Sequence, residues 1–359
     1  MKKTVTLVFT VLLAFTVIAC GSNGPDEPGI PEVTVTGEQS STDDTTESTE
    51  TAPATDSTTE ETNEALPPED AGLLFPDRYP IAFMVNNVAA ARPQSGLDKA
   101  KLIYQLMTEG RTTRLLLLTD AQEGIIGPIR SARPAYLDLV AQHQAFYSHA
   151  GNQKVITASP VKANIKSLDA LDGHYSMYYR TEHRKSPHNL YTTMEKAYAR
   201  AEKTFGEITP QQQLDGLYVH AGFTLPDEGE QVTRIDYKFS SLKEAFQYDA
   251  KKNVYYKYND DKILKDEQSK ENLEVANIII LHRPHGLMPN NVHTKVDWLG
   301  ENVAATYLTG GQKYDITWDK ASHTDPIVYY LNGEELVLNP GLTWVVVVDD
   351  RALNTIEYE

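Results

Sequence analysis

The sequence predicts an α+β protein, in which a mixed α/β N-terminal domain is followed by an antiparallel β-rich C-terminal domain. Three observations lead to this fold class. Residues 1–75 hold an apolar leader and an acidic low-complexity stretch, which leaves residues 76–359 for folding. Residues 76–215 alternate between strand and helix patterns, whereas residues 225–359 carry strand patterns alone. The boundary falls between these ranges, where Gln, Gly, Pro and Asp gather.

The N-terminal domain is expected to combine strands with two longer helices. Apolar runs at 102–107 and 113–119 are joined by the turn residues at 108–111, which predicts a hairpin. Apolar residues at helical spacing, with Pro134 just ahead of them, predict a helix over 135–144. A second helix is expected over 193–205, which is rich in Ala, Glu and Lys. Further strands are expected at 79–86 and 145–148.

The C-terminal domain is expected to consist of short strands joined by turns. Asn332-Gly333 between two apolar runs predicts a two-residue type I′ hairpin. Alternating, aromatic-rich segments predict the strands, at 233–239, 245–248, 254–258, 275–281, 303–308, 312–318, 327–331, 336–338 and 344–348.

The lone cysteine, Cys20, ends a secretory leader. Lys2 and Lys3 precede an apolar run, and small residues lead up to Cys20. This pattern is typical of a bacterial lipoprotein signal over residues 1–19, with Cys20 lipidated and left as the new N-terminus. A transmembrane helix over 4–19 is the alternative, but it falls short of the roughly 20 residues that span a bilayer. We therefore expect a protein anchored to the cell membrane by lipid, on its extracytoplasmic face.

Residues 20–75 are expected to form a disordered acidic tether. Half of the residues from 33 to 62 are Ser or Thr, and residues 21–75 hold 14 acidic and no basic side chains. Such a segment cannot bury enough apolar surface to fold. The net charge of the chain is −17, yet residues 76–359 carry only −5. With no basic excess on the folded part, nucleic acid is not an expected partner.

Polar residues of one kind gather at the ends of predicted elements in the N-terminal domain, in loops that a rigid scaffold can aim together. Arginine presents a planar, permanently charged fork that suits carboxylate or phosphate. We expect one polar cleft formed by Arg92, Gln94, Glu109, Arg114, Arg130, Arg133, His149, Arg184, His188 and Asn189. The alternative is that these arginines brace loops through backbone carbonyls and nearby carboxylates.

Five of these stretches, at 91–100 (ARPQSGLDKA), 108–114 (TEGRTTR), 127–133 (GPIRSAR), 149–151 (HAG) and 184–191 (RKSPHNLY), resemble the YerB-like bacterial lipoproteins, which pair two domains of unknown function. Residues 339–344 (NPGLTW) are similar to the closing strand of that family. The chain departs from the family pattern at Gln105, where the family has Glu, and at Lys101, where it has Asp. The resemblance implies architecture and location, and no established reaction.

Three functional classes stay open. The first is a protein that binds an anionic or sugar ligand of the envelope through the arginine-rich cleft. The second is a hydrolase acting on envelope polymer, with His149 or His188 and Glu109 as acid–base candidates, although no G-x-S-x-G elbow occurs. The third is an interaction protein that docks another envelope protein.

No cofactor or metal is expected. Phosphate-loop and dinucleotide motifs are absent from the sequence. His282, His285 and His293 are compatible with one metal, but transition-metal sites need three or four converging ligands. Pro284 and Gly286 make this stretch an ordinary turn.

Overall fold

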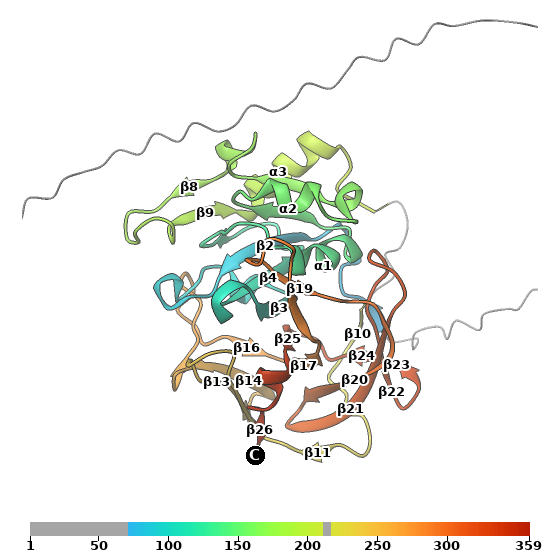
Figure 1. Ribbon diagram of the computed structural model, residues 1–359. Coiled ribbons are helices and arrows are strands. Elements are labelled where there is room, and N and C mark those ends of the chain that lie inside the picture. Colours follow the sequence, from blue (N-terminus) through green and yellow to red (C-terminus); the bar gives the residue numbers. More distant parts are fainter. Residues whose placement is uncertain (1–70, 211–216) are drawn as a thin grey trace, which may run out of the picture. The chain divides into compact units, whose positions relative to one another are not determined.

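A computed structural model describes residues 71–210 and 217–359. Within those residues, a twelve-stranded mixed sheet forms the centre of the fold (Figure 1). Its strand order is β23 (Glu334–Glu335), β22 (Val328–Leu331), β21 (Gln312–Lys320), β20 (Gly300–Thr309), β17 (Asn277–His282), β25 (Thr343–Val348), β3 (Leu102–Met107), β4 (Thr113–Thr119), β2 (Ile81–Asn86), β6 (Phe146–His149) and β7 (Lys166–Asp169), with β11 (Glu230–Gln231) on β21.

The sheet is continuous across both halves of the chain. β25, from the C-terminal half, runs parallel to β3 on one side and parallel to β17 on the other. Most other pairs in the C-terminal half are antiparallel, as expected, but the β17–β25 pair is not. The α+β fold class is confirmed, because strands dominate and the helices cover strands of the N-terminal half.

Smaller sheets surround the central one. The first is β15 (Lys262–Ile263), β14 (Val254–Asn259), β13 (Glu244–Asp249), β12 (Arg234–Tyr237) and β26 (Glu357–Tyr358), with β16 (Glu274–Val275) paired to β14. The others are β1 (Ala71–Leu73), β10 (Tyr218–His220) and β24 (Val337–Leu338); β5 (Ile125–Ile126), β9 (Leu190–Thr193) and β8 (Tyr179–Arg180); and β18 (His285–Leu287) with β19 (Thr294–Val296).

The helices belong mainly to the N-terminal half and lie on the same side as its strands in Figure 1. They are α1 (Leu137–Gln142), α2 (Gln153–Thr157), α3 (Met194–Phe205) and α4 (Asp350–Leu353). Thr193 caps α3 by accepting a hydrogen bond from the Lys196 amide at 3.3 Å. The helix predicted over 135–144 is shorter than expected, because its first turn is a 3₁₀ helix at Pro134–Tyr136. Other 3₁₀ helices lie at Ala89–Ala91, Leu97–Lys99, Glu109–Arg111, Lys162–Asn164 and Tyr175–Met177.

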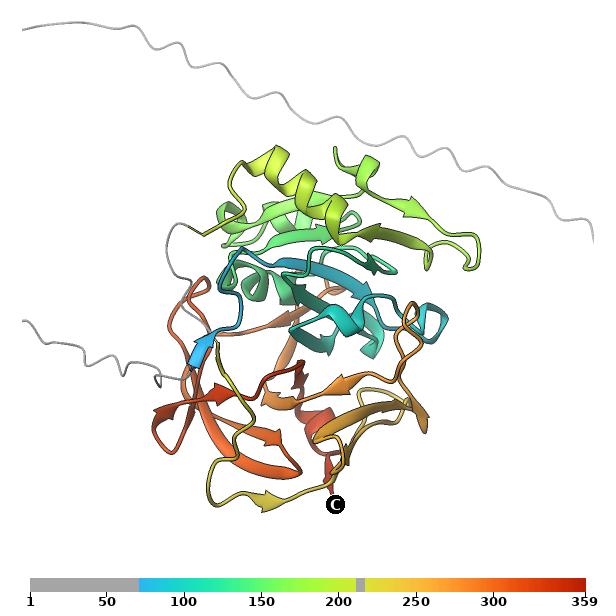
Figure 2. The ribbon, with the colours of Figure 1, turned by 180° about the vertical axis from the view of Figure 1, so that it is seen from behind.

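The predicted tether ends earlier than residue 75. β1 pairs with β10, and β10 pairs in parallel with β24 of the C-terminal half, as Figure 2 shows from behind. Leu74 and Phe75 are buried. Composition placed these residues in the tether, but strand pairing and burial hold them in the fold. Cys20, the leader and residues 20–70 of the predicted tether lie outside the described residues.

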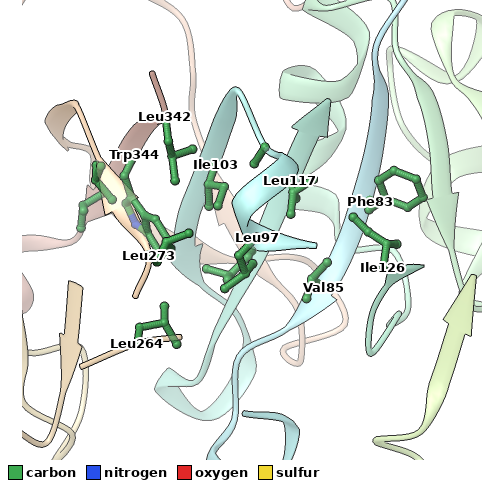
Figure 3. Close-up of a cluster of buried hydrophobic side chains, with 14 of the residues drawn as sticks. Phe83, Val85, Leu97, Ile103, Leu117, Ile126, Leu264, Leu273, Leu342 and Trp344 are labelled. Carbon is green, nitrogen blue, oxygen red and sulfur yellow. The ribbon is translucent and has the colours of Figure 1, made fainter. Parts of the chain in front are cut away.

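Hydrophobic packing joins the two halves of the chain. Figure 3 shows Leu97 and Ile103 of the N-terminal half beside Leu264, Leu273 and Trp344 of the C-terminal half. All of these side chains are buried in one cluster, which lies on one face of the central sheet. The division into domains at about 215–225 stays a prediction. Among the described residues, we find no helix with the length and apolar character needed to span a bilayer.

Candidate functional site

Five of the ten predicted polar residues gather along one edge of the central sheet. β2 is antiparallel to β4 with Asn86 opposite Arg114, and it is parallel to β6. β3 is antiparallel to β4, with Met107 opposite Thr113. The carboxyl ends of β2, β3 and β6 therefore meet the start of β4 at a shared edge. In open α/β sheets, ligands commonly bind outside the carboxyl ends of the strands.

The segment at 128–132 fills the gap where β2 and β6 separate. The Arg130 amide donates to the Met84 carbonyl at 2.8 Å, and the Arg130 carbonyl accepts from the Ala150 amide at 2.9 Å. The Ala132 amide donates to Gly151 at 3.2 Å. This local ladder fixes the backbone on both sides of Ser131, and thereby places the Arg130 and Arg133 side chains at the sheet edge.

Three arginines and one carboxylate form what we call the arginine cluster: Glu109, Arg114, Arg130 and Arg133. Arg133 donates from Nε to both carboxylate oxygens of Glu109, at 2.9 and 2.7 Å. Arg114 Nη2 lies 3.8 Å from Glu109 Oε1, and Arg114 Nη1 donates to the Ser131 carbonyl. The Arg114 side chain is only 6% exposed. Glu109 thus serves two arginines at once.

Arg130 differs from its two neighbours. Its guanidinium makes no hydrogen bond with any residue that the structure describes, and its Nε is buried without a partner. A buried donor without an acceptor costs about 1–3 kcal/mol. Native proteins rarely leave such a group unpaired, so each one calls for an explanation. Here the missing acceptor is the feature that a bound anion would supply.

The electrostatics of the cluster favour an added anion. Burial and the positive charge of Arg133 together lower the pKa of Arg114 to about 10, although the charge of Glu109 opposes the shift. Burial and the charge of Arg133 also lower the pKa of Arg130. Burial alone would raise the pKa of Glu109, but the hydrogen bonds and charge of Arg133 bring it to about 2. Three cations therefore lie near one carboxylate, which pairs with only two of them.

Two histidines border the arginine cluster. His188 Nδ1 lies 2.8 Å from the Asn86 amide nitrogen, and burial together with the charges of Arg130 and Arg184 lowers the pKa of His188. Burial and the charge of Arg133 lower the pKa of His293, whose Nε2 lies 3.5 Å from the Asn152 amide nitrogen. In both rings the lowered pKa favours the neutral imidazole.

The sequence identified His188, but it missed His293 and Asn152 as members of this site. His293 reaches the cluster from the β18–β19 hairpin, more than 150 residues away along the chain. No local signal marks that approach. The left-handed backbone of Asn152, with φ 71° and ψ 39°, is likewise visible only in the structure.

Three of the predicted residues brace a loop. Arg184 donates to the carbonyls of Ala90, Arg92 and Pro93, and its Nη2 lies 2.7 Å from Glu267. Arg184 therefore fits the bracing alternative that the sequence left open.

Arg92 and Gln94 also bond this loop. Arg92 donates twice to the Asn87 carbonyl. Gln94 donates to Asn86 and Asn87, although its Oε1 stays buried without a partner.

His149 and Asn189 also make structural contacts away from the arginine cluster. The His149 side chain is fully buried, with Nε2 at 2.8 Å from Ser167 Oγ and Nδ1 at 3.2 Å from the Gly151 carbonyl. Asn189 accepts from Arg180 and donates to Thr181 within the 180–189 hairpin. The expected single cleft of ten residues is thus divided: Glu109, Arg114, Arg130, Arg133 and His188 come together, while the other five serve neighbouring loops and strands.

The three histidines that were considered as metal ligands form contacts with separate partners. His282 pairs with Asp350 at 2.7 Å, His285 contacts the Arg283 carbonyl, and His293 contacts Asn290. Within the ranges 71–210 and 217–359, no group of three or more His, Cys, Asp or Glu side chains is arranged to hold a metal ion.

Comparison with known proteins identifies the family. Residues 70–207 match the family described as "Protein of unknown function (DUF3048) N-terminal domain", and residues 234–345 match its C-terminal domain. The "Putative lipoprotein YerB" of Bacillus subtilis (strain 168) is 26% identical over 277 residues, which span 76% of this chain and 82% of that relative.

The crystal structure of the YerB protein from Bacillus subtilis has a similar fold. The TM-score is 0.68 at 24% sequence identity, and the match covers 79% of this chain and 94% of that chain. The two matched domains, taken with this common fold, place the chain in the YerB-like family, whose members pair an N-terminal and a C-terminal domain of unknown function.

Proposed function

We propose that this protein is a membrane-anchored lipoprotein that binds an anionic group of the cell envelope through the arginine cluster. The observation that carries the binding proposal is the Arg130 guanidinium, which has no hydrogen-bond acceptor among the described residues although its Nε is buried. Arg114 and Arg133 lie beside it and share a single carboxylate. A phosphate or carboxylate on an envelope polymer would supply the missing acceptors.

The location rests on two supports. Cys20 follows a positively charged, then apolar leader that ends in small residues. A relative that spans most of this chain carries the name "Putative lipoprotein". Growth with a clickable fatty acid tests the anchor. The wild-type chain should become labelled, and labelling of Cys20→Ser at the wild-type level would refute the anchor.

The ligand test measures the thermal stability of the purified full chain with inorganic phosphate and N-acetylmuramic acid as anionic probes. N-acetylglucosamine serves as the neutral control. A ligand present at a hundred times its dissociation constant adds about 2.7 kcal/mol to the free energy of unfolding. We expect stabilisation by at least one anionic probe and none by the neutral sugar.

The matched variants are Arg130→Gln and Arg78→Gln. Both remove one positive charge, but Arg78 precedes β2 and so lies at the opposite edge of the sheet from the arginine cluster. Arg130→Gln should abolish the stabilisation, whereas Arg78→Gln should keep it. Equal stabilisation of both variants would show that the anion binds elsewhere, and the absence of any stabilisation would favour the interaction-protein class.

A hydrolase is the second candidate, because His149 pairs with a hydroxyl that the sequence did not single out. The Gly151 carbonyl near His149 Nδ1 can only accept a hydrogen bond, so Nδ1 carries the proton. Nε2 is then the acceptor for the Ser167 hydroxyl at 2.8 Å, which is the arrangement of a nucleophile and its general base. Asp169 lies 3.8 Å from Nδ1, but it accepts hydrogen bonds from the Gly151 and Leu171 amides instead.

A fluorophosphonate probe separates the two candidates. A hydrolase that uses Ser167 would be labelled at that residue, and Ser167→Ala would lose the label. We rank this candidate second because the His149 side chain is fully buried, which restricts approach to the pair. Failure of the probe to label the wild-type chain would remove it.

A further inference from the structure

A cavity lies between the two halves of the chain, and none of its lining residues belongs to the arginine cluster. Its volume is about 420 Å³, within the usual range for small-molecule sites. One wall comes from the loop that follows β2, with Ala89, Arg92 and Pro93, and the other comes from residues 259–265. Leu264, at one wall, also belongs to the buried hydrophobic cluster that Figure 3 shows. The wall on this side is therefore anchored in the core.

An unpaired amide lines this cavity. Asn259 ends β14 and is only 7% exposed, yet its Oδ1 is buried with no hydrogen-bond partner in the described part of the chain. Burying an amide oxygen without a donor costs about 1–3 kcal/mol. An apolar residue at this position would avoid that cost. The polar side chain therefore suits a ligand that brings an N–H or O–H group to the oxygen.

The charges around the cavity favour an anion. Arg92, Lys262 and Lys265 line it, against the single carboxylate of Asp260. Arg92 uses Nε and Nη2 to bond the Asn87 carbonyl, while its Nη1 has no acceptor among the described residues. A guanidinium fixed in this way keeps one donor edge for a carboxylate or phosphate.

The remaining walls are apolar. Ala89, Pro93 and Ile263 supply hydrocarbon surface beside the polar groups. A few placed polar groups on mainly apolar walls are the usual composition of a small-molecule site.

We infer that this cavity binds a small organic anion that carries a hydrogen-bond donor beside an apolar portion. The anionic group lies against Arg92 Nη1, and the donor reaches Asn259 Oδ1. None of these residues belongs to the arginine cluster, so this site and the proposed envelope-anion site stand or fall separately.

Isothermal titration of the full chain tests the inference with three probes: N-acetyl-leucine, N-acetylmuramic acid and mandelic acid. Each has a carboxylate and an amide N–H or hydroxyl donor. N-acetyl-leucinamide is the control, because it keeps the donor and the apolar part but lacks the charge. We expect at least one probe to bind the wild-type chain. Its affinity for the wild-type chain should be about tenfold or more higher than its affinity for the Asn259→Leu variant, which corresponds to about 1.4 kcal/mol.

The variants make the test independent of folding. Asn259→Leu replaces an unpaired amide by a hydrocarbon side chain of similar volume, so the fold should persist. Circular dichroism checks this. Arg92→Gln should weaken binding to the same degree, whereas Arg130→Gln should leave it unchanged. Absence of binding by all three probes up to about 20 mM, or equal binding by wild type and Asn259→Leu, would overturn the inference. Loss of binding in Arg130→Gln would instead assign the probe to the arginine cluster.

Discussion

Lys257 Nζ lies 2.8 Å from Glu244 Oε2, and the two side chains are only 1% and 2% exposed. Gln105 donates to both oxygens of this carboxylate, at 3.0 and 2.8 Å, and its own Oε1 accepts from Tyr237 and Trp344. The pair thus connects β3 of the N-terminal half with four strands of the C-terminal half. A carboxylate at position 105 would add a second negative charge here, whereas the amide of Gln105 keeps the pair balanced.

Lys257→Met should lower the free energy of unfolding by about 3–5 kcal/mol, because it leaves Glu244 charged and buried without its cation. The double variant Lys257→Met/Glu244→Gln should recover much of that loss, since it removes the stranded charge. Denaturant unfolding measures both. Lys252→Met breaks the exposed Lys252–Glu274 pair and should leave the unfolding midpoint nearly unchanged. A Lys257→Met chain as stable as the Lys252→Met chain would contradict this account.

Arg184→Ala should destabilise the protein by about 2–4 kcal/mol, since it removes the cation that pairs with Glu267 and leaves three backbone carbonyls without their donor. Lys185→Ala, at the neighbouring exposed position, is the control and should cost little. Thermal unfolding compares the two, and limited proteolysis should cut the Arg184→Ala chain faster near residues 90–93. Equal stability of both variants would return Arg184 to the list of ligand residues.

Arg130→Gln should not destabilise the protein, because the Arg130 guanidinium has no hydrogen-bond acceptor to lose among the described residues. Relief of its repulsion with Arg114 and Arg133 should raise the free energy of unfolding by up to about 1 kcal/mol at low ionic strength. The gain should shrink in about 1 M salt, where the screening length is about 3 Å. Unfolding curves at two salt concentrations measure it, with Arg78→Gln as control. A loss of stability would show that Arg130 has a structural partner.

Protonation of Glu109 should lower the free energy of unfolding in acid. The folded pKa of Glu109 is about 2, below its ordinary value of 4.5, because Arg133 donates to the carboxylate despite the opposing effect of burial. A depressed folded pKa contributes stability above pH 4.5, and this contribution is lost as the pH falls toward 2. The side chain is 33% exposed, so after solvent screening the contribution is on the order of 2 kcal/mol.

Unfolding curves between pH 2 and pH 5 check this slope. Glu109→Gln should flatten the profile in that window, whereas Glu301→Gln, which changes an exposed carboxylate on β20, should leave it as in the wild type. Parallel profiles for the wild-type and Glu109→Gln chains would exclude Glu109 as the cause.

Local signals in the sequence predicted the local structure. The β3–β4 hairpin, helix α3 and the turn at Asn332-Gly333 all appear where the patterns place them. Both turn residues have positive φ, 54° and 86°, as a type I′ turn requires. These elements depend on periodicity, caps and turn residues, which neighbouring residues along the chain supply. The family could also be predicted, because its motifs are contiguous stretches.

The site was predicted only in part, since contacts across the fold select the partner of each charged side chain. Residue type identified Arg130 and Arg133 as anion-binding candidates, but not that Glu109 would engage Arg133 and leave Arg130 without an acceptor. Nor could residue type show that Arg184 bonds three carbonyls of a loop more than 90 residues away.

The sequence by itself determined the element types, the leader pattern around Cys20 and the family. Tertiary structure decided how the halves join: β25, among the last strands of the chain, inserts in parallel between β3 and β17. The reason is physical. Parallel neighbours need long connections, so their pairing leaves no trace in the adjacent sequence. The same long-range pairing decides which buried charges meet, and with them which arginine is left without an acceptor among the described residues.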